Sequence, residues 1–206
     1  MTDYFALLSE PRRPWLDAER LKSRFHDLSL QWHPDRFHHA PIAERQAAHE
    51  RFGELNAAYH CLREPKPRLR HLLELEGETG LDQVQNVSPD LIDLFAEIGA
   101  ACREVRAADA EKAGASSSIL RAQQLEAALG WSDRFSKLEQ KINAYREPLL
   151  AELQRLDPRW TAAPPPGSAA RRSALPLART RQIYQALGFL DRWLAQVQER
   201  LLPLNL

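Results

Sequence analysis

Apolar residues recur at every third or fourth position along most of this 206-residue chain, and this spacing constrains its fold more than any other feature. The spacing places apolar side chains on one face of an α-helix, whereas a half-buried β-strand would alternate them at every second residue. The sequence contains neither strand-like alternation nor an internal repeat. It therefore predicts an all-α fold.

Two amphipathic segments near the N-terminus predict a helical hairpin. The first begins after Asp17, a favourable N-cap residue, and ends before Pro34, which has no N–H to donate. The second begins near Pro41. Because the loop between them is short, the helices should pack antiparallel. A third, short helix should begin at Pro65. The apolar stripes of the two long helices are Leu21, Phe25, Leu28 and Trp32 in the first, and Ala48, Phe52, Leu55, Tyr59 and Leu62 in the second.

The rest of the chain predicts further helices separated by breaks. We expect residues 1–76 to form one domain, 77–88 a linker, and 89–206 a second helical domain. Breaks in periodicity are expected at "KAGASSS" and at Gly130-Trp131-Ser132, with a long helix from about 133 to 156. The segment at about 161–178 is rich in Pro and Ala, which is typical of a flexible loop. The last helix should carry Ile183, Leu187, Leu190, Leu194 and Val197 on one face.

The composition argues against several classes of protein. With 28 basic and 28 acidic residues the formal net charge is zero, which argues against a strongly nucleic-acid-binding domain. Cys61 and Cys102 form no CxxC pair, which fits a reducing compartment. No apolar run is long enough to span a bilayer, and the N-terminus does not resemble a secretory signal. We therefore expect a cytoplasmic protein whose partners include neither nucleic acid nor a membrane.

The stretch "LQWHPDRFHH" allows three interpretations. His33, Asp35, His38 and His39 could bind a metal ion, but helical zinc-ligand spacing such as HExxH is absent and no cysteine lies near. An acid–base pair would need a nucleophile or a phosphate-binding loop, and neither is present. The third interpretation is a docking tip between two helices. We therefore expect no metal, no cofactor and no enzymatic activity.

The docking-tip interpretation agrees with a known family. The segments "RFHDLSLQWHPDRF" and "ELNAAYHCLREPKPRLRHLLEL" resemble a J domain, the ATPase-stimulating module of DnaJ-type co-chaperones. The opening "MTDYFALLSEPRRPWLD" and "LRHLLELEG" resemble the HscB type, which serves iron–sulfur cluster assembly. The resemblance is dense over residues 1–76 and thinner in "KLEQKINAYREPLLAELQRLD" and "GFLDRWLAQVQERL". It implies a C-terminal three-helix bundle that binds an IscU-like scaffold.

The resemblance implies a chaperone-binding site at the tip and a client-binding site on the bundle. Asp35 should pair with a cation of a DnaK/HscA-type ATPase, with Pro34 fixing the tip and His33 supporting it. Basic side chains at Lys22, Arg24 and Arg36 should steer docking on an acidic surface, whereas Arg20 is expected to be solvated. The client-binding residues are expected to be Leu94, Phe95 and Phe189, which lie at the edges of the apolar stripes or off them.

The chain departs from the family pattern at two insertions, around 113–131 and 161–178. The first helix of the bundle, "LFAEIGAACREV", is also smaller and less acidic than the family pattern. Two other functions therefore remain open. One is a general J-domain protein with a different client. The other is nucleic-acid binding by the arginines of the second insertion and the helix after it, Arg171, Arg172, Arg179 and Arg181.

Overall fold

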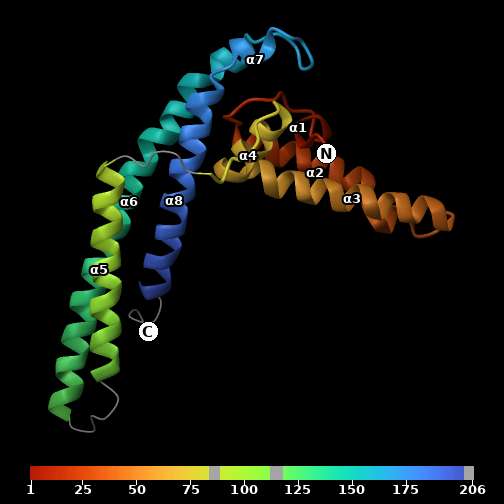
Figure 1. The fold of residues 1–206 in the computed structure, drawn as a ribbon. Helices are drawn as coiled ribbons and strands as arrows, with labels where there is room; N and C mark the ends of the chain where they lie inside the picture. The colour runs from red at the N-terminus through yellow and green to blue at the C-terminus, as the bar shows by residue number, and fades with distance from the viewer. Residues whose placement is uncertain (84–88, 112–117, 202–206) are drawn as a thin grey trace. The chain divides into compact units, whose positions relative to one another are not determined.

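The structure is a computed structural model that describes residues 1–83, 89–111 and 118–201 (Figure 1). Every regular element in these ranges is helical, which confirms the all-α prediction. In chain order the elements are α1 (Tyr4–Leu7), α2 (Ala18–Trp32), the 3₁₀ helix η1 (Pro34–Phe37), α3 (Ile42–Arg63), α4 (Pro65–Leu75), α5 (Pro89–Glu111), α6 (Ser118–Thr161), α7 (Arg171–Ala174) and α8 (Leu177–Leu201).

The chain divides into two compact units. Unit 1 comprises residues 1–82 and 150–184, and unit 2 comprises 83–149 and 185–206. The long helices α6 and α8 therefore contribute residues to both units. The predicted boundary after residue 76 follows the chain order, whereas the observed units also draw in segments from the C-terminal half.

The predicted hairpin is formed by α2 and α3, which lie side by side (Figure 1). Asp17 caps α2 by accepting a hydrogen bond from the backbone N–H of Arg20 at 2.7 Å, and the helix ends at Trp32, as predicted. Between the helices, Phe25 and Tyr59 stack with ring centroids 4.3 Å apart. On α3, the buried residues are Ala48, Leu55, Ala58 and Leu62.

Two short elements complete the N-terminal part of unit 1. The helix α1 was not predicted; it is capped by Asp3, and its Phe5 is buried. The backbone N–H of Tyr4 donates a hydrogen bond to Nε2 of His71 on α4 at 3.1 Å. The buried guanidinium of Arg68 donates to the carbonyls of Pro14 and Leu62, both at 2.8 Å. Burial lowers the pKa of Arg68 to about 10.

The prediction of a flexible loop at about 161–178 holds only for part of the segment. Residues 162–170 form no helix and none of them is buried, whereas the end of the segment packs within unit 1, where Arg171, Leu175 and Leu177 are buried. Arg171 donates through Nε to both carboxylate oxygens of Glu76, at 2.9 and 3.0 Å, and through Nη1 to the carbonyl of Pro164. Because the Arg171 and Glu76 side chains are only 6% and 7% exposed, they form a buried ion pair. Because this ion pair joins residues 95 positions apart, the local composition of the segment could not predict it.

Unit 2 is a bundle of α5 with parts of α6 and α8 (Figure 1). The predicted break at Gly130-Trp131-Ser132 was wrong, because α6 continues through it. Trp131 packs against the core next to Phe135, and this packing outweighs the low helix propensity of a single glycine. The sequence Ser88-Pro89 predicts an N-cap followed by a proline in the first turn of α5, and Ser88 lies outside the described residues. The buried core comprises Leu91, Leu94, Ile98, Ala101, Cys102, Val105, Phe135, Leu138, Ile142, Leu190, Trp193, Val197 and Leu201.

Candidate functional site

The His33-Pro34-Asp35 tripeptide forms the turn between α2 and α3. His33 is the C-cap residue of α2 and the N-cap residue of η1, and Pro34 begins η1. The Nδ1 atom of His33 accepts a hydrogen bond from the backbone N–H of Asp35 at 3.3 Å, and Asp35 Oδ2 lies 3.5 Å from it. The imidazole ring also packs edge-on against Phe52 of α3, with centroids 5.5 Å apart. His33 therefore connects the tip to the helix behind it.

The tip presents one highly exposed carboxylate on an ordered turn. The Asp35 side chain is 89% exposed. Arg36 is tied back to the end of α2, since its Nη1 donates to the carbonyl of Leu30 at 3.3 Å. Trp32 and Phe37 stack across the turn with centroids 6.0 Å apart. A group recognising Asp35 would therefore meet a carboxylate whose backbone is held from both sides.

The basic side chains of α2 differ in their availability. Lys22 and Arg24 are exposed and form no ion pair within the described part of the chain. Arg20, which was expected to be solvated, instead bonds through Nε to the buried carboxylate of Glu10 at 3.1 Å. On α2, the basic side chains available to an acidic partner are therefore Lys22 and Arg24, and not Arg20.

Among residues 1–83, 89–111 and 118–201, the structure brings together no group of His, Cys, Asp or Glu side chains suited to a metal ion. His38 and His39 contact each other edge to face, with centroids 4.7 Å apart, and both are exposed. No helix in the same ranges has the length and apolarity needed to cross a bilayer.

The three residues predicted to bind a client lie in different environments. Phe95 is 56% exposed, Phe189 is half-buried, and Leu94 is 4% exposed in the core of unit 2. The expectation that Leu94 is an exposed contact was therefore wrong, whereas Phe95 is exposed as the client-binding prediction requires. Sequence reasoning also missed Trp193. Its ring stacks on that of Phe95 with centroids 5.6 Å apart and contacts that of Phe189 with centroids 5.9 Å apart. Trp193 lies four residues after Phe189 and one helical turn away, and this spacing could have revealed it.

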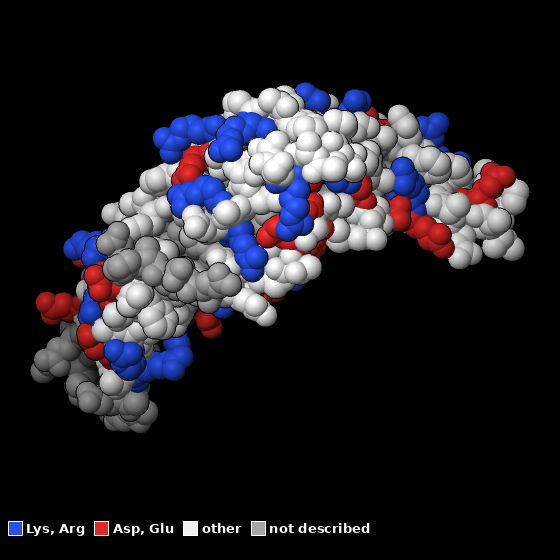
Figure 2. All heavy atoms as spheres, turned by 45° about the horizontal axis from the view of Figure 1, so that its top comes forward, with Lys and Arg blue, Asp and Glu red and all other residues white. Residues whose placement is uncertain are grey.

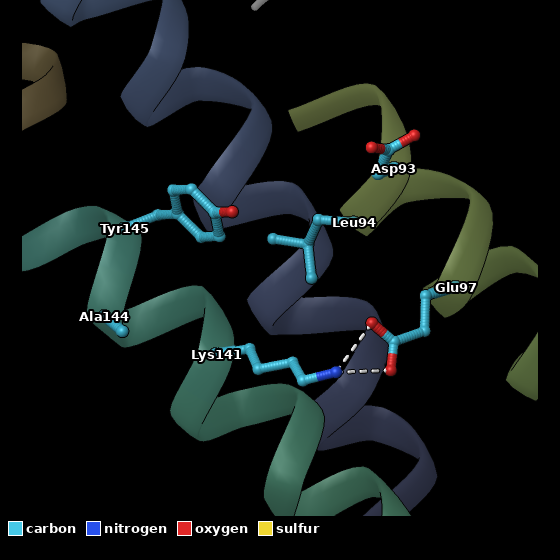
Figure 3. A pocket seen from close by; sticks show the side chains of 6 residues that line it. All are labelled: Asp93, Leu94, Glu97, Lys141, Ala144 and Tyr145. Atoms are coloured by element: carbon cyan, nitrogen blue, oxygen red, sulfur yellow. Dashed lines mark hydrogen bonds and ion pairs between the residues drawn. The ribbon is translucent and has the colours of Figure 1, made fainter. Parts of the chain in front are cut away.

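A groove of about 470 Å³ lies between α5 and α6 in unit 2 (Figure 3). Leu94 and Tyr145 face each other across it from the two helices. Glu97 of α5 and Lys141 of α6 form an ion pair at one end, with Lys141 Nζ 2.6 and 2.9 Å from the two carboxylate oxygens. Asp93 and Ala144 complete the lining.

The arginines proposed for nucleic-acid binding are engaged by carboxylates within unit 1. Arg171 pairs with Glu76, Arg179 with Glu152, and both Arg172 and Arg181 with Glu78. On the face shown in Figure 2, basic and acidic side chains are interspersed rather than gathered into fields of one sign. This arrangement does not favour a polyanion-binding surface.

Residues 3–71 match the family described as "DnaJ domain". These residues contain the whole α1–α4 assembly except the end of α4, and the tip lies at their centre. The chain is similar to co-chaperones of the HscB type. Its sequence is 37% identical over 107 residues to the "Co-chaperone protein HscB homolog" of Aromatoleum aromaticum, and 36% identical over 107 residues to the protein of the same name from Azoarcus sp.. Each alignment covers 52% of this chain and 60% of the relative.

Solved structures share the fold over nearly the whole chain. It superposes on "Chaperone HscB from Vibrio cholerae" with a TM-score of 0.61 at 20% identity, covering 96% of each chain. The human co-chaperone protein HscB gives a TM-score of 0.66 at 17% identity, covering 98% of this chain and 84% of the human one. The likeness in fold therefore extends beyond the J domain into the C-terminal helices.

Proposed function

We propose that this chain is a co-chaperone that stimulates the ATPase of a DnaK/HscA-type chaperone through the tip of its J domain. The observation that carries the proposal is the exposed Asp35 carboxylate on a turn held by His33 and Pro34. A carboxylate held in this way can pair with a cation of the chaperone through charge-assisted hydrogen bonds. Because little ordering remains to be done at the turn, the entropic cost of docking is low.

The exposed basic residues of α2 support docking of the chaperone at this end of the hairpin. Lys22 and Arg24 lie on the helix that leads to the tip, so an acidic surface of the chaperone would attract both. These contacts should raise the association rate at low salt and weaken as salt screens them. Arg36 is less available, because its guanidinium already bonds to the carbonyl of Leu30.

The client in this proposal is an IscU-like iron–sulfur scaffold that binds unit 2. Phe95, Trp193 and Phe189 form a continuous aromatic cluster on α5 and α8, and Phe95 is its most exposed member. Exposed aromatic side chains backed by a packed core are the usual form of an interface anchor. The small residues Gly99 and Ala100 on α5 support an alternative, a J-domain protein with a different client that approaches this helix more closely.

The chaperone step is tested with Asp35→Asn in single-turnover ATP hydrolysis by a DnaK/HscA-type chaperone. The variant should remain folded, since Asp35 is exposed, and should lose nearly all stimulation. Asp27→Asn is the matched control, because Asp27 is an exposed aspartate on the same α2 and forms no ion pair among the described residues. Normal stimulation by Asp35→Asn, or an equal loss with Asp27→Asn, would contradict docking through the tip.

The client step is tested by calorimetric titration of a purified IscU-type scaffold into the whole chain. Phe95→Ala should weaken binding by about 1–2 kcal/mol, as truncation of an interface anchor commonly does. Adding Phe189→Ala to Phe95→Ala should weaken binding further. Because Phe189 is half-buried, circular dichroism is needed to confirm that the variant is folded. Leu129→Ala, which removes another exposed apolar side chain of unit 2, should leave affinity unchanged. Normal binding by a folded Phe95→Ala variant would place the client elsewhere.

A further inference from the structure

The groove between α5 and α6 has an apolar floor and carries more negative than positive side chains. Leu94, Ala144 and Tyr145 supply the apolar lining, and Asp93 and Glu97 supply two carboxylates (Figure 3). Only Glu97 has a cationic partner, since Lys141 bonds to both of its oxygens. Asp93 forms no hydrogen bond or ion pair with the residues that the structure describes. The groove therefore holds two negative charges and one positive charge.

The ion pair in the groove is exposed and exchangeable. The Lys141 and Glu97 side chains are about half exposed, so solvent screens their attraction. The lysine stem is flexible and can swing to water while its carbons stay along the groove wall. A competing cation could therefore take the place of the Lys141 ammonium group on Glu97 without disturbing the core of unit 2.

We propose that Lys141 competes with a cationic side chain of the client for the carboxylate of Glu97. The client segment that fits the groove carries an apolar side chain, which contacts Ala144 and Tyr145, next to a lysine or arginine, which pairs with Asp93 and Glu97. Docking displaces Lys141 from Glu97. This inference rests on client binding by unit 2, and it adds a second contact surface, on the side of α5 that faces α6, to the aromatic cluster shared with α8.

Charge complementarity favours this occupant over an acidic one. An acidic segment would meet Asp93 and Glu97 with only Lys141 to attract it, whereas a basic segment meets two carboxylates once Lys141 has moved. The competition has a predictable sign: removing the lysine charge strengthens binding of a basic client, although it also removes an ion pair from the free protein.

The experiment compares Lys141→Gln with Lys137→Gln in calorimetric titrations of the whole chain with a purified IscU-type scaffold. Lys137 lies one turn earlier on α6 and pairs with Asp133 of the same helix at 2.6 Å, so both variants lose one lysine charge and one surface ion pair. At about 50 mM salt, Lys141→Gln should bind roughly two- to five-fold more tightly than wild type, as expected for an exposed pair. Lys137→Gln should match wild type, and Asp93→Asn should bind more weakly. At about 500 mM salt the gain should vanish.

The outcomes separate this inference from the proposed function. If wild type binds the scaffold and Lys141→Gln binds equally or more weakly, the competitor role is overturned while client binding stands. If none of the variants nor wild type binds the scaffold, both proposals fall. Tighter binding by both lysine variants would indicate a general charge effect and would also overturn the role of Lys141.

Discussion

His71 accepts a hydrogen bond from the backbone of α1 through a nitrogen that protonation would occupy. Burial lowers its pKa below the ordinary 6.5, opposed by Asp3 and Glu74 and aided by Arg12. The unfolded chain therefore binds a proton near pH 6.5 that the folded chain resists, so stability is complete above this pH and falls as the pH drops below it. We expect the free energy of unfolding, measured by urea titration from pH 7.5 to 5, to decrease over this interval.

The control for this pH dependence is the substitution of another histidine in the same unit. His71→Gln should reduce the decrease in stability below pH 6.5, whereas His49→Gln, at an exposed position on α3, should retain it. Identical pH profiles for wild type and His71→Gln would show that His71 does not link protonation to folding.

The adjacent arginines Arg171 and Arg172 should differ widely in their effect on stability. Among the residues that the structure describes, Arg171→Ala leaves the buried carboxylate of Glu76 with Arg12 as its one cationic partner, whose Nη1 is 3.6 Å away. The substitution should cost about 3–5 kcal/mol. Arg172 is 61% exposed where it pairs with Glu78, so Arg172→Ala should cost no more than about 1 kcal/mol. Urea unfolding followed by circular dichroism measures both. Similar costs for the two substitutions would mean that the Arg171–Glu76 pair is not sequestered from water.

At the scale of elements, two glycines should respond to alanine with opposite signs. Gly130 lies in α6, and a Cβ atom there would contact nothing within 4 Å, so Gly130→Ala should stabilise the protein by about 0.5–1 kcal/mol. Gly77 follows α4 with φ +80°, and its Cβ would lie 3.1 Å from Arg172 Nη1. Gly77→Ala should therefore destabilise by at least about 1 kcal/mol. Thermal unfolding checks both, and a destabilised Gly130→Ala would argue against a continuous α6.

The helices that sequence predicted correctly are those with strong local signals. Asp17 and Pro34 delimit α2, and Pro65 begins α4, because capping and missing N–H groups act within a single turn. The four-residue helix α1 was missed because it is too short to show a period. The continuity of α6 was missed because the packing of Trp131 and Phe135 against the core outweighs the local effect of Gly130.

The candidate sites were predictable to different degrees. The tip was visible because its three residues are contiguous and follow a capped helix. On α5, spacings of three and four residues fit Leu91–Leu94–Ile98 and Leu91–Phe95–Ile98 equally well, and only the position of the neighbouring helices decides that Leu94 is buried. The Glu97–Lys141 pair joins residues 44 positions apart, so no local pattern could reveal it.

At the scale of the whole molecule, the J domain should be less stable when it is cut from the rest of the chain. A fragment of residues 1–76 lacks the packing of Leu153 and Trp160 and the Arg13–Asp157 ion pair, all within unit 1. Hydrogen exchange of the α3 and α4 amides should therefore be faster in the fragment than in the whole chain. Arg13→Ala should accelerate exchange in the whole chain and much less in the fragment, where Asp157 is missing. Equal protection in both would mean that residues 150–184 add nothing to the J domain.

The buried pair of Glu76 and Arg171 joins residues 95 positions apart, and this has a consequence for the order of synthesis. A ribosome adds roughly 5–20 residues per second, so Glu76 emerges about 5–20 s before the arginine that neutralises it. During that interval the hairpin of α2 and α3 can form, because its contacts lie within residues 18–63. Unit 1 as a whole can close only when translation is almost complete. A nascent chain would thus display the His33-Pro34-Asp35 turn before its own N-terminal unit is finished.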